Sequence, residues 1–454
     1  MHRRDIVITF LVVLLVTVGI QSYAQKERDE TYQHYETLAT VVQKIKAEYV
    51  DQVSEKEIFD GALRGVVLNL DRYSAYISPE DLEDFQAKTT GEFEGLGIEI
   101  GVRDKVLTVI APMEDTPASR AGILAGDRIV EIEGESTQDM SITDAVKRLR
   151  GRKGTKVTIT IMRAGSNETQ PITITRGVIP LISVRGYRRP NRNGEWDYFA
   201  DPDARIGYIR IGAFQENTVR DFDEAVKKLR DQGMKALVLD LRFNPGGQLI
   251  SAIEMCNRFL SEGNIVSTKG RVGPVRNYKA NRKDTLPDFP VAILVNNWSA
   301  SASEIVTGAL QDHKRALIVG EHTFGKGSVQ TVFRLEGGRA ALKLTTAHYF
   351  TPSGRGIHRD EKTGEGGLKP DIEVVTSIED KVKLQQHWYK LSSPDEPEPE
   401  QKQTPDTEPE QKPDNEPKED KKDEEKTDEP FVDAQLQRAL DALKALELFK
   451  KDAA

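Results

Sequence analysis

The sequence predicts a multidomain α/β protein, and three observations support this fold class. The chain has 454 residues, which corresponds to about three domains at roughly 150 residues each. Apolar residues follow helical spacing over residues 31–85 and change to short alternating strands over residues 91–176. Beyond residue 179, apolar strands alternate with helical stretches, which is typical of a βαβ core.

The first 24 residues have the pattern of a secretory signal peptide. The stretch Ile6 to Ile20 is mostly apolar, follows Arg3 and Arg4, and is shorter than the ~20 residues that comfortably span a bilayer. Ser22 and Ala24 supply the small side chains of a cleavage site, so we expect cleavage after Ala24. The alternative interpretation is an uncleaved anchor in the inner membrane. Under both interpretations the rest of the chain is exported, which predicts a periplasmic protein.

Residues 25–90 form the predicted helical N-terminal region, and residues 91–177 a compact, mostly β domain. In the β domain, short apolar runs alternate with polar residues, as expected for strands with one buried face. The expected strands are 97–102, 106–110, 128–132 and 157–163, with one helix near residues 142–149.

Residues 178–391 form the predicted α/β core. Its strands are expected at the apolar runs 206–211, 236–241, 291–295 and 317–319, and its helices at 218–229, 249–260 and 303–309. The single cysteine, Cys256, lies in one of these helical runs and is expected to be buried. It can form no intrachain disulfide.

The negative charge of the chain is concentrated in a tail. Residues 392–430 contain 16 acidic residues, six lysines and no hydrophobic residue, whereas residues 25–391 carry no net charge. A neutral body argues against nucleic acid as the main partner. The tail cannot bury enough apolar surface to offset its ordering entropy, so we expect it to be disordered.

Residues 431–454 contain a last amphipathic helix. Its apolar positions return to helical spacing at Leu436, Leu440, Leu443, Leu446 and Leu448. Two interpretations remain open, because a helix of this length is marginally stable alone. It docks on the folded body or on a partner, or it belongs to the solvated tail.

A glycine-flanked turn opens the β domain. Gly95-Leu96-Gly97-Ile98 leads into the first expected strand, and a helix rich in apolar positions follows about fifty residues later. A strand edge beside a helix forms a groove in which an extended peptide can add to the sheet. The amides of Leu96, Gly97 and Ile98 could then receive its terminal carboxylate. Such a turn is weak evidence alone, but the later string Thr116-Pro-Ala-Ser-Arg-Ala-Gly-Ile-Leu-Ala-Gly-Asp-Arg-Ile resembles the PDZ domains of bacterial proteases.

Several serines cluster where a core strand meets a helix. The strand ending at Val295 continues into Asn296-Asn-Trp-Ser-Ala-Ser301-Ala-Ser-Glu304. Helix N-termini favour developing negative charge, so a nucleophilic serine would be well placed here. Ser301-x-x-Glu304 is equally a capping box, and the residues alone favour that structural role.

A serine nucleophile needs a base, and the histidines of this half of the chain lie in no recognisable triad context. Lysine is the other candidate, because Phe324-Gly-Lys326-Gly-Ser-Val-Gln330 places Lys326 between two glycines in a loop. To act as a base, Lys326 must be desolvated so that its pKa falls well below the usual ~10.4. Gln330 could hold its amine toward a serine.

The same stretch superficially matches a phosphate-binding loop. Gly320-Glu-His-Thr-Phe-Gly325-Lys326 fits the first seven positions of that motif. The eighth position is Gly327 where Ser or Thr is required, and residues 328–335 alternate like a strand where a helix is needed. A nucleotide-hydrolysing function is therefore disfavoured.

A sharp glycine turn ends another core strand in Asp240-Leu-Arg-Phe-Asn-Pro-Gly246-Gly247. This is a routine strand-to-helix turn unless its amides have a further role. If it faces the same side of the sheet as Ser301, the amide of Gly246 or Gly247 could complete an oxyanion hole with that of Ala302.

Together these three strings resemble the carboxyl-terminal processing proteases, also called tail-specific proteases. The likeness covers about residues 31–386 and includes Asp71-Arg-Tyr-Ser-Ala-Tyr-Ile-Ser-Pro. The resemblance implies that Ser301 is the nucleophile, Lys326 the general base and Gln330 the residue that orients the lysine. It implies oxyanion donors at the amides of Ala302 and Gly246 or Gly247.

The resemblance also implies a fold and partners. The fold would be an N-terminal helical dimerisation region, an inserted PDZ domain at residues 91–177, and a protease cap and core at residues 178–391 related to the crotonase type of α/β sheet. Such proteins use no metal or cofactor and cut polypeptides near nonpolar C-termini that the PDZ groove binds. A homodimer or higher homo-oligomer is expected, and an adaptor protein is a candidate further partner.

Trp298 and Arg150 are two further residues of interest. Trp298 stands where the family usually has a small residue, so the shape of the substrate pocket is in question. Arg150, at the end of the predicted PDZ helix, is a candidate polar relay, although arginines at helix ends commonly interact only with the helix dipole.

The sequence favours one of three candidate functions. We expect an exported Ser/Lys endopeptidase in protein processing or envelope quality control, in which a bound C-terminus shifts the enzyme toward an active state. A non-catalytic PDZ scaffold and a nucleotide hydrolase are disfavoured, because every residue that the peptidase chemistry requires is present.

Overall fold

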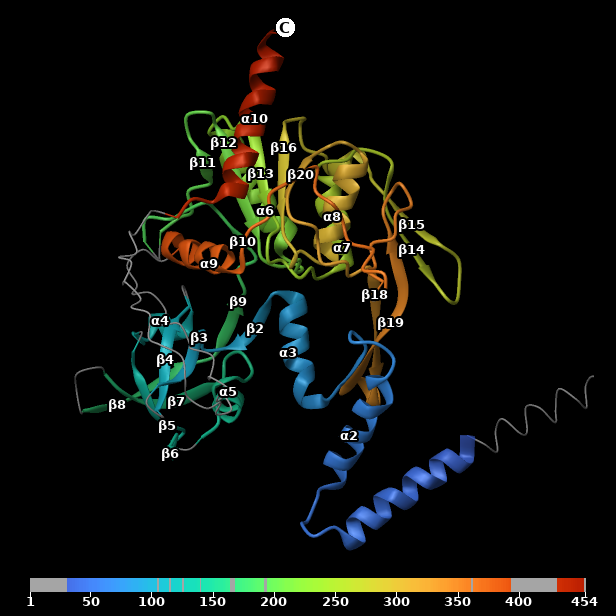
Figure 1. Cartoon of the computed structure of the whole chain (residues 1–454). Coiled ribbons are helices and arrows are strands. Elements are labelled where there is room, and N and C mark those ends of the chain that lie inside the picture. The colour runs from blue at the N-terminus through green and yellow to red at the C-terminus, as the bar shows by residue number, and fades with distance from the viewer. Residues whose placement is uncertain are drawn as a thin grey trace, which may run out of the picture. The chain divides into compact units, whose positions relative to one another are not determined.

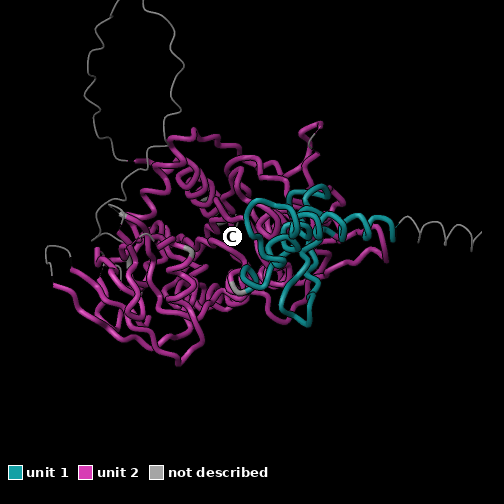
Figure 2. Tube along the Cα trace, turned by 90° about the horizontal axis from the view of Figure 1, so that it is seen from below, with its two compact units in different colours: residues 1–82, 330–345 teal, residues 83–329, 346–454 magenta. Residues whose placement is uncertain are grey.

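The computed structural model (Figure 1) describes residues 31–103, 106–113, 116–124, 126–138, 140–163, 168–191, 194–360, 362–392 and 431–452. These residues form two compact units (Figure 2). Unit 1 comprises the residues up to Leu82 and the insertion Gln330–Thr345, and unit 2 comprises the rest. The predicted signal peptide and nearly all of the predicted disordered tail lie outside the described residues.

Unit 1 contains the predicted N-terminal helices. Residues 31–48 are helical, and helix α2 (Glu55–Leu68) begins at a capping box formed by Ser54 and Glu57. Strand β1 (Ala75–Ile77) pairs antiparallel with the part of strand β19 (Ala340–Phe350) that belongs to this unit. Strand β1 was not expected from the sequence, because three residues are too short to show an alternating pattern.

The β domain is part of unit 2. Its main sheet has the order β3 (Ile98–Arg103), β4 (Val106–Pro112), β5 (Arg128–Ile132), β7 (Lys156–Met162) and β8 (Thr169–Thr175), and strand β6 (Glu135–Ser136) pairs with β5. Helix α5 (Ile142–Leu149) packs against β3 and β5, and the short helix α4 (Pro117–Arg120) precedes β5. Strands β2 (Glu92–Gly95) and β9 (Gly177–Pro180) form a ribbon at the two ends of the domain. The sequence predicted helix α5 and strands β3, β4, β5 and β7, but it did not predict β8.

The α/β core, also in unit 2, is built on a mostly parallel sheet. Parallel strands β12 (Ile206–Ile211), β13 (Ala236–Asp240), β16 (Val291–Val295), β17 (Leu317–Gly320) and β20 (Ile372–Glu373) follow one another. The short strands β10 (Val184–Arg185) and β11 (Phe199–Asp201) pair antiparallel with β12. Every residue of β13 and β16 is buried, as expected for a parallel sheet covered on both faces. The βαβ prediction is confirmed.

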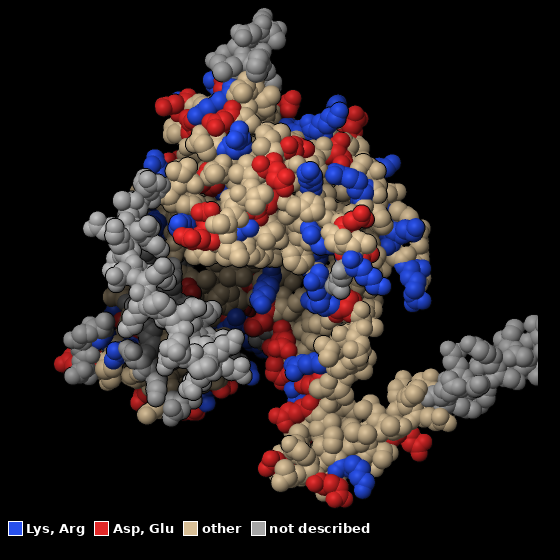
Figure 3. All heavy atoms as spheres, in the orientation of Figure 1, with Lys and Arg blue, Asp and Glu red and all other residues tan. Residues whose placement is uncertain are grey.

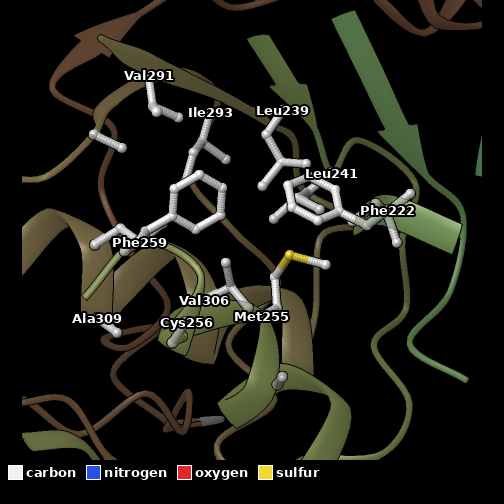
Figure 4. Packing of buried hydrophobic residues seen from close by; sticks show 14 of the residues in the cluster. Phe222, Leu239, Leu241, Met255, Cys256, Phe259, Val291, Ile293, Val306 and Ala309 are labelled. Atoms are coloured by element: carbon white, nitrogen blue, oxygen red, sulfur yellow. The ribbon is translucent and has the colours of Figure 1, made fainter. Parts of the chain in front are cut away.

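One face of this sheet packs against three helices, α6 (Thr218–Asp231), α7 (Leu249–Asn257) and α8 (Ala302–Asp312). Figure 4 shows Phe222, Met255 and Phe259 filling the space beside Leu239, Leu241 and Ile293 of the strands. Cys256 lies in this layer and is fully buried, as predicted. Burial raises the pKa of its thiol well above the ordinary value, so the thiol is protonated at neutral pH.

The opposite face of the sheet is covered by the last helix, α10 (Ala434–Asp452) (Figure 1). Leu436, Ala439, Leu440 and Leu443 pack on side chains of β12, β13, β16 and β17. The structure thus decides between the two interpretations of this helix, which docks on the folded body.

Several elements have no clear signal in the sequence. They are the hairpin β14 (Asn264–Gly270) and β15 (Arg276–Lys279), strand β19, helix α9 (Ile378–Ser392), and two short 3₁₀ turns, Arg282–Asp284 and Glu336–Gly338. Helix α3 (Pro79–Thr90), in contrast, lies within the predicted helical region 25–90. Strand β18 (Ser328–Leu335) is found where the alternation at residues 328–335 predicted a strand. This strand rules out the helix that a phosphate-binding loop requires.

The charges on the visible face of the core are mixed in sign. Figure 3 shows Lys and Arg interspersed with Asp and Glu, in agreement with the neutral balance of residues 25–391. Within the described ranges, the helices are all too short or too polar to cross a membrane.

Candidate active site

Ser301 lies at the sharp turn between β16 and α8. It occupies the N-cap position of α8 with φ 55° and ψ −112°, a conformation that non-glycine residues adopt only when their surroundings enforce it. Its exposed fraction is 7%. Residues with such strained backbones concentrate at active sites, which supports a functional role for Ser301 beyond capping.

Hydrogen bonds join the serine loop to the turn that follows β13. Ser299 Oγ donates to the Leu241 carbonyl at 2.8 Å, and the Asn244 carbonyl accepts from the Ala300 N–H at 3.0 Å and from Ser303 Oγ at 2.9 Å. All of these groups are buried. Ser299 and Ser303 are therefore structural, and the two loops form one rigid body.

The two glycines of the Asp240 string are in close contact with different segments: Gly246 lies against the serine loop, and Gly247 lies against the main chain of Phe214. A Cβ on Gly246 (φ +98°) would lie 2.7 Å from the Ala300 carbonyl oxygen and 2.8 Å from the Ala302 nitrogen. A Cβ on Gly247 would lie 2.0 Å from the Phe214 carbonyl oxygen. Only glycine allows this close approach.

The candidate oxyanion donors differ in their hydrogen bonding. The Gly246 N–H donates to Asn244 Oδ1 at 2.8 Å. Among the described residues, neither the Gly247 N–H nor the Ala302 N–H has a hydrogen-bond acceptor. Gly247 and Ala302 therefore have the amides that remain available for a developing oxyanion.

The loop that contains Lys326 is fixed by Arg359. The Arg359 guanidinium donates to the carbonyls of Phe324 and Thr323 at 3.0 and 2.8 Å, and the Arg359 N–H donates to the Gly325 carbonyl at 2.9 Å. The Phe324 N–H in turn donates to the Ser299 carbonyl at 3.1 Å. The lysine loop is thus attached directly to the serine loop.

Glu304 holds both loops through a single carboxylate. Its Oε2 accepts from the Ser301 N–H at 2.9 Å and from the Lys326 N–H at 2.8 Å. Its Oε1 accepts from the Gly325 N–H at 2.7 Å and from Thr323 Oγ1 at 2.6 Å. Glu304 is completely buried. Burial raises its pKa above the ordinary value although these four donors oppose the shift.

Sequence reasoning assigned Glu304 only to a capping box. The half of that box in which Glu304 accepts from the Ser301 N–H is present. What the pattern could not show is that the same carboxylate reaches residues 323–326, which lie 19 to 22 positions later in the chain. The capping-box pattern Ser301-x-x-Glu304 was the one feature of the local sequence that pointed to Glu304.

The histidines of the core are engaged away from Ser301. A ring nitrogen of His313 lies 2.8 Å from the Asn264 carbonyl, and Nδ1 of His322 lies 3.0 Å from the Arg359 guanidinium. The ring of His348 packs on that of His358. This arrangement agrees with the sequence-based preference for lysine as the base.

Gln330 belongs to the insertion of unit 1. Its Nε2 donates to Thr345 Oγ1 at 3.3 Å, and Thr345 Oγ1 donates to Asp71 Oδ1 at 3.1 Å. Asp71 also accepts from the N–H groups of Tyr73 and Ser74. Asp71, in the string that resembles the family, thus positions Thr345, and Thr345 in turn accepts a hydrogen bond from Gln330. The pairing of Gln330 with Lys326 would join the two units and stays a prediction.

Trp298 lies on an aromatic stack beside the serine loop. Its ring is stacked on Phe243 with centroids 5.1 Å apart and an interplanar angle of 18°, and Lys381 Nζ lies 5.3 Å from its centroid. The side chain is 43% exposed. The indole is therefore accommodated by packing on the loop after β13 and presents its free surface to solvent.

The predicted peptide-binding loop has the expected shape. The carbonyls of Leu96 and Gly97 accept from the N–H groups of Ala118 and Met113 at 2.9 and 2.8 Å, which directs these carbonyls into the domain. Gly97 has φ +77°, and a Cβ there would lie 2.3 Å from Thr116 Cβ. Strand β3, which begins at Ile98, is the edge of its sheet and lies beside α5. A strand edge beside a helix is the arrangement to which an extended peptide can add, and the groove at Leu96, Gly97 and Ile98 stays a prediction.

Arg150 ends helix α5 and forms an ion pair with Asp84 of α3. Its guanidinium also lies 5.3 Å from the centroid of the Phe93 ring. These contacts give Arg150 a specific partner beyond the helix dipole, as a relay would require.

Comparison with known proteins agrees with this fold. Residues 205–374 match the family model of peptidase family S41, and residues 108–163 match that of the PDZ domain. A carboxy-terminal-processing protease of Bartonella bacilliformis is 38% identical over 379 residues, which cover 82% of each chain. A carboxyl-terminal-processing protease of Synechocystis is 36% identical and covers 77% of this chain and 78% of its own. The carboxy-terminal processing protease CtpA of Bacillus subtilis is 32% identical and covers 81% of this chain and 75% of its own.

The α/β core, the strained serine beside the lysine loop and the PDZ domain define a PDZ-containing serine peptidase. The chain belongs to the carboxyl-terminal processing proteases of family S41. It is a C-terminal processing serine peptidase whose PDZ domain binds polypeptide C-termini.

Proposed function

We propose that Ser301 is the nucleophile of this peptidase and Lys326 its general base. The observation that supports this assignment best is the Glu304 carboxylate, whose single oxygen Oε2 accepts from the main chains of both residues. A fully buried carboxylate with four donors is a rigid connection, and catalytic groups must be held within a fraction of an ångström.

The proposed reaction uses these groups in sequence. Neutral Lys326 takes the proton of Ser301 Oγ while Oγ attacks the peptide carbonyl carbon. The amides of Ala302 and Gly247, or its neighbour Gly246, hold the negative carbonyl oxygen. The C–N bond then breaks, the lysine ammonium gives its proton to the leaving amine, and water hydrolyses the acyl-serine. In this mechanism Gln330, held by Thr345 and Asp71, orients the lysine amine.

The assignment is tested by cleavage of an unstructured protein that ends in Ala-Ala. The parent, Ser301→Ala and Lys326→Ala are compared, and product termini are read by mass spectrometry. Ser303→Ala is the control, because this neighbouring buried serine donates to the Asn244 carbonyl. We expect both dyad variants to lose essentially all activity and Ser303→Ala to keep most of it. Full activity of Ser301→Ala would refute the assignment.

We further propose that occupation of the PDZ groove activates the enzyme through helix α3. Asp84 of α3 pairs with Arg150 at the end of the groove helix. Five residues further along α3, near its C-terminal end, the Thr89 carbonyl accepts from Gln248 Nε2 at 2.7 Å, and Gln248 follows the candidate donor Gly247 directly. A bound C-terminus that moves α5 would thereby bias the oxyanion loop.

This gating is tested with Asp84→Asn and Gln248→Ala. The control is Lys88→Ala on the same helix, whose side chain is exposed. We measure peptidase activity on a substrate with a free nonpolar C-terminus and on the same substrate with that C-terminus blocked. We expect the first two variants to reduce the difference between the substrates and the control to preserve it. An unchanged difference in all three variants would contradict the relay.

We also propose that the protein acts outside the cytoplasm, in the periplasm, and processes or removes envelope proteins. This proposal is supported by the signal-like pattern of residues 1–24. N-terminal sequencing of the protein from periplasmic and membrane fractions tests it. A mature terminus at Gln25 supports export with cleavage, an intact terminus in the membrane fraction supports export with an anchor, and a cytoplasmic protein contradicts export.

A further inference from the structure

The buried guanidinium of Arg242 connects the C-terminal helix to the loop that carries Gly246 and Gly247. Arg242 follows strand β13 by two residues and has an exposed fraction of 2%. The main chain continues through Phe243 and Asn244 to the two glycines. The position of Arg242 therefore sets where this loop begins.

The contacts of Arg242 account for all five N–H donors of a guanidinium. Nε donates to both carboxylate oxygens of Asp240 at 3.0 Å. Nη2 donates to Asp240 Oδ2 at 2.6 Å and to Asp433 Oδ2 at 2.8 Å. Nη1 donates to Asp433 Oδ1 at 2.8 Å and to Gln435 Oε1 at 3.1 Å. Three of these acceptor atoms thus come from residues more than 190 positions later in the chain.

Asp433 can hold Arg242 only while α10 is docked. Asp433 Oδ1 also accepts from the Leu436 N–H at 3.1 Å, so the same carboxylate caps the first turn of α10. Gln435 donates to the Val374 carbonyl at 2.8 Å. The helix then packs its buried leucines on the sheet.

The start of the loop is strained and depends on such support. Phe243 has φ +58°, and its N–H donates to Asn296 Oδ1 at 3.0 Å. The Arg242 N–H donates to Asp240 Oδ1 at 2.9 Å. A strained backbone persists only where its surroundings determine it, and here they include the guanidinium that Asp433 holds.

We propose that Asp433 is a positioning residue for peptide hydrolysis. From the N-terminus of α10 it holds Arg242, and through Arg242 it keeps the loop of Gly246 and Gly247 against Ser301. The C-terminal segment thereby completes the active site of its own chain, although it lies outside the residues that match the peptidase family. This proposal rests on the proposed assignment of Ser301 and its oxyanion donors.

The test compares Asp433→Asn with Leu440→Ala in the full-length protein. Asparagine still caps the helix but removes the charge that pairs with Arg242, whereas Leu440→Ala weakens docking without touching Arg242. We measure kcat and KM for the Ala-Ala substrate well below the melting temperature, together with binding of a C-terminal peptide to the PDZ domain. We expect Asp433→Asn to lower kcat by about tenfold or more, with KM and peptide binding unchanged, because a small displacement of a catalytic group can cost ~10²-fold. Leu440→Ala should lower the melting temperature and keep the parental kcat.

A double variant tests whether Asp433 acts through Arg242. If it does, Asp433→Asn added to Arg242→Lys lowers kcat little beyond Arg242→Lys alone. The positioning role would be overturned if Asp433→Asn had the parental kcat, or if Asp433→Asn and Leu440→Ala lost kcat equally. In either case, an inactive Ser301→Ala would leave the assignment of the active site intact. An active Ser301→Ala would overturn both.

Discussion

At the scale of single residues, the site depends on glycines whose missing side chains let main chains meet. Gly246 and Gly233 both have positive φ, at +98° and +82°. Of the two, only Gly246 has atoms close enough to clash with an added Cβ, namely the Ala300 oxygen and the Ala302 nitrogen. Alanine substitutions at the two positions therefore distinguish two effects. At Gly233 only the backbone strain of a positive φ is added, whereas at Gly246 the loop must also be displaced.

We expect Gly246→Ala to lower kcat by two or more orders of magnitude, because the loop must move away from Ser301 and Ala302. Gly233→Ala should cost only about 1 kcal/mol of stability from its backbone and leave kcat unchanged. Steady-state kinetics and thermal unfolding of both variants check this. Comparable activity in the two variants would show that the close approach at Gly246 is unimportant.

Glu304 can be tested by the nearly isosteric change Glu304→Gln. The glutamine amide has only one acceptor oxygen. If its NH₂ group replaces Oε2, it faces the N–H groups of Ser301 and Lys326, which donate to Oε2 in the parent. We expect a loss of about 1–3 kcal/mol for each unsatisfied donor and a large fall in kcat, because the main chains of Ser301 and Lys326 lose their shared acceptor. Thermal unfolding and kinetics measure the two effects.

Glu321→Gln is the matched control for Glu304→Gln. Glu321 is also a buried carboxylate, which accepts from Thr376 and pairs with Lys381. Among the described residues, its carboxylate has no hydrogen bond to the serine loop or the lysine loop. It should lose stability without a specific loss of kcat. A Glu304→Gln variant that unfolds earlier but keeps full kcat would assign Glu304 to stability alone.

At the scale of elements, α10 supplies the layer that a parallel sheet needs on its second face. Burial disfavours the charged form of Asp433, but the charge and hydrogen bonds of Arg242 outweigh burial, so the pKa of Asp433 lies below its ordinary value of 3.8. Such a carboxylate stabilises the folded state above its unfolded pKa, and this contribution is lost as pH falls through the folded value. Burial also lowers the pKa of His387, the titratable side chain beside Asp433.

We therefore expect α10 to remain docked from neutral pH to about pH 4 and to loosen only below it. Hydrogen exchange of the α10 amides, corrected for the intrinsic pH dependence of exchange, measures this. Asp433→Asn should be less protected at neutral pH and should lack this acid transition. Loss of protection already near pH 6 in the parent would contradict a role for Asp433 and point to His387.

At the scale of the whole molecule, the helical part of unit 1 exposes a series of large apolar side chains. They occur on residues 31–50 and on α2, and include Tyr32, Tyr35, Val41, Tyr49, Val50, Phe59, Leu63, Val66 and Leu68. Exposed apolar surface of this extent is typical of an interaction surface. It agrees with the dimerisation that family resemblance implies.

We expect the purified protein to be a homodimer or higher oligomer that dissociates when Val41 and Val66 are both replaced by Glu. Thr40→Glu, at an exposed polar position of the same helix, is the control for added charge. Sedimentation velocity measures the oligomeric state. A parent that is monomeric at micromolar concentration would contradict this expectation.

The sequence alone determined the elements with strong local patterns and the residues that lie in contiguous strings. Strands β5, β12 and β16 and helix α5 begin and end where their periodicity predicted, because buried strands and amphipathic helices repeat over a few residues. Ser301, Gly246 and Lys326 could be named because each stands in a motif that is continuous in the chain. The PDZ loop at Gly97 was identified in the same way.

Tertiary structure alone decided the contacts between residues that are distant in the chain. The convergence of Ser301 and Lys326 on Glu304, the chain from Gln330 through Thr345 to Asp71, and the docking of α10 have no local pattern. The same holds for the pairing of Arg242 with Asp433, 191 positions apart. Local propensity reports on backbone conformation over a few residues, whereas a buried charge finds its partner only after the sheet and its covering helices have packed.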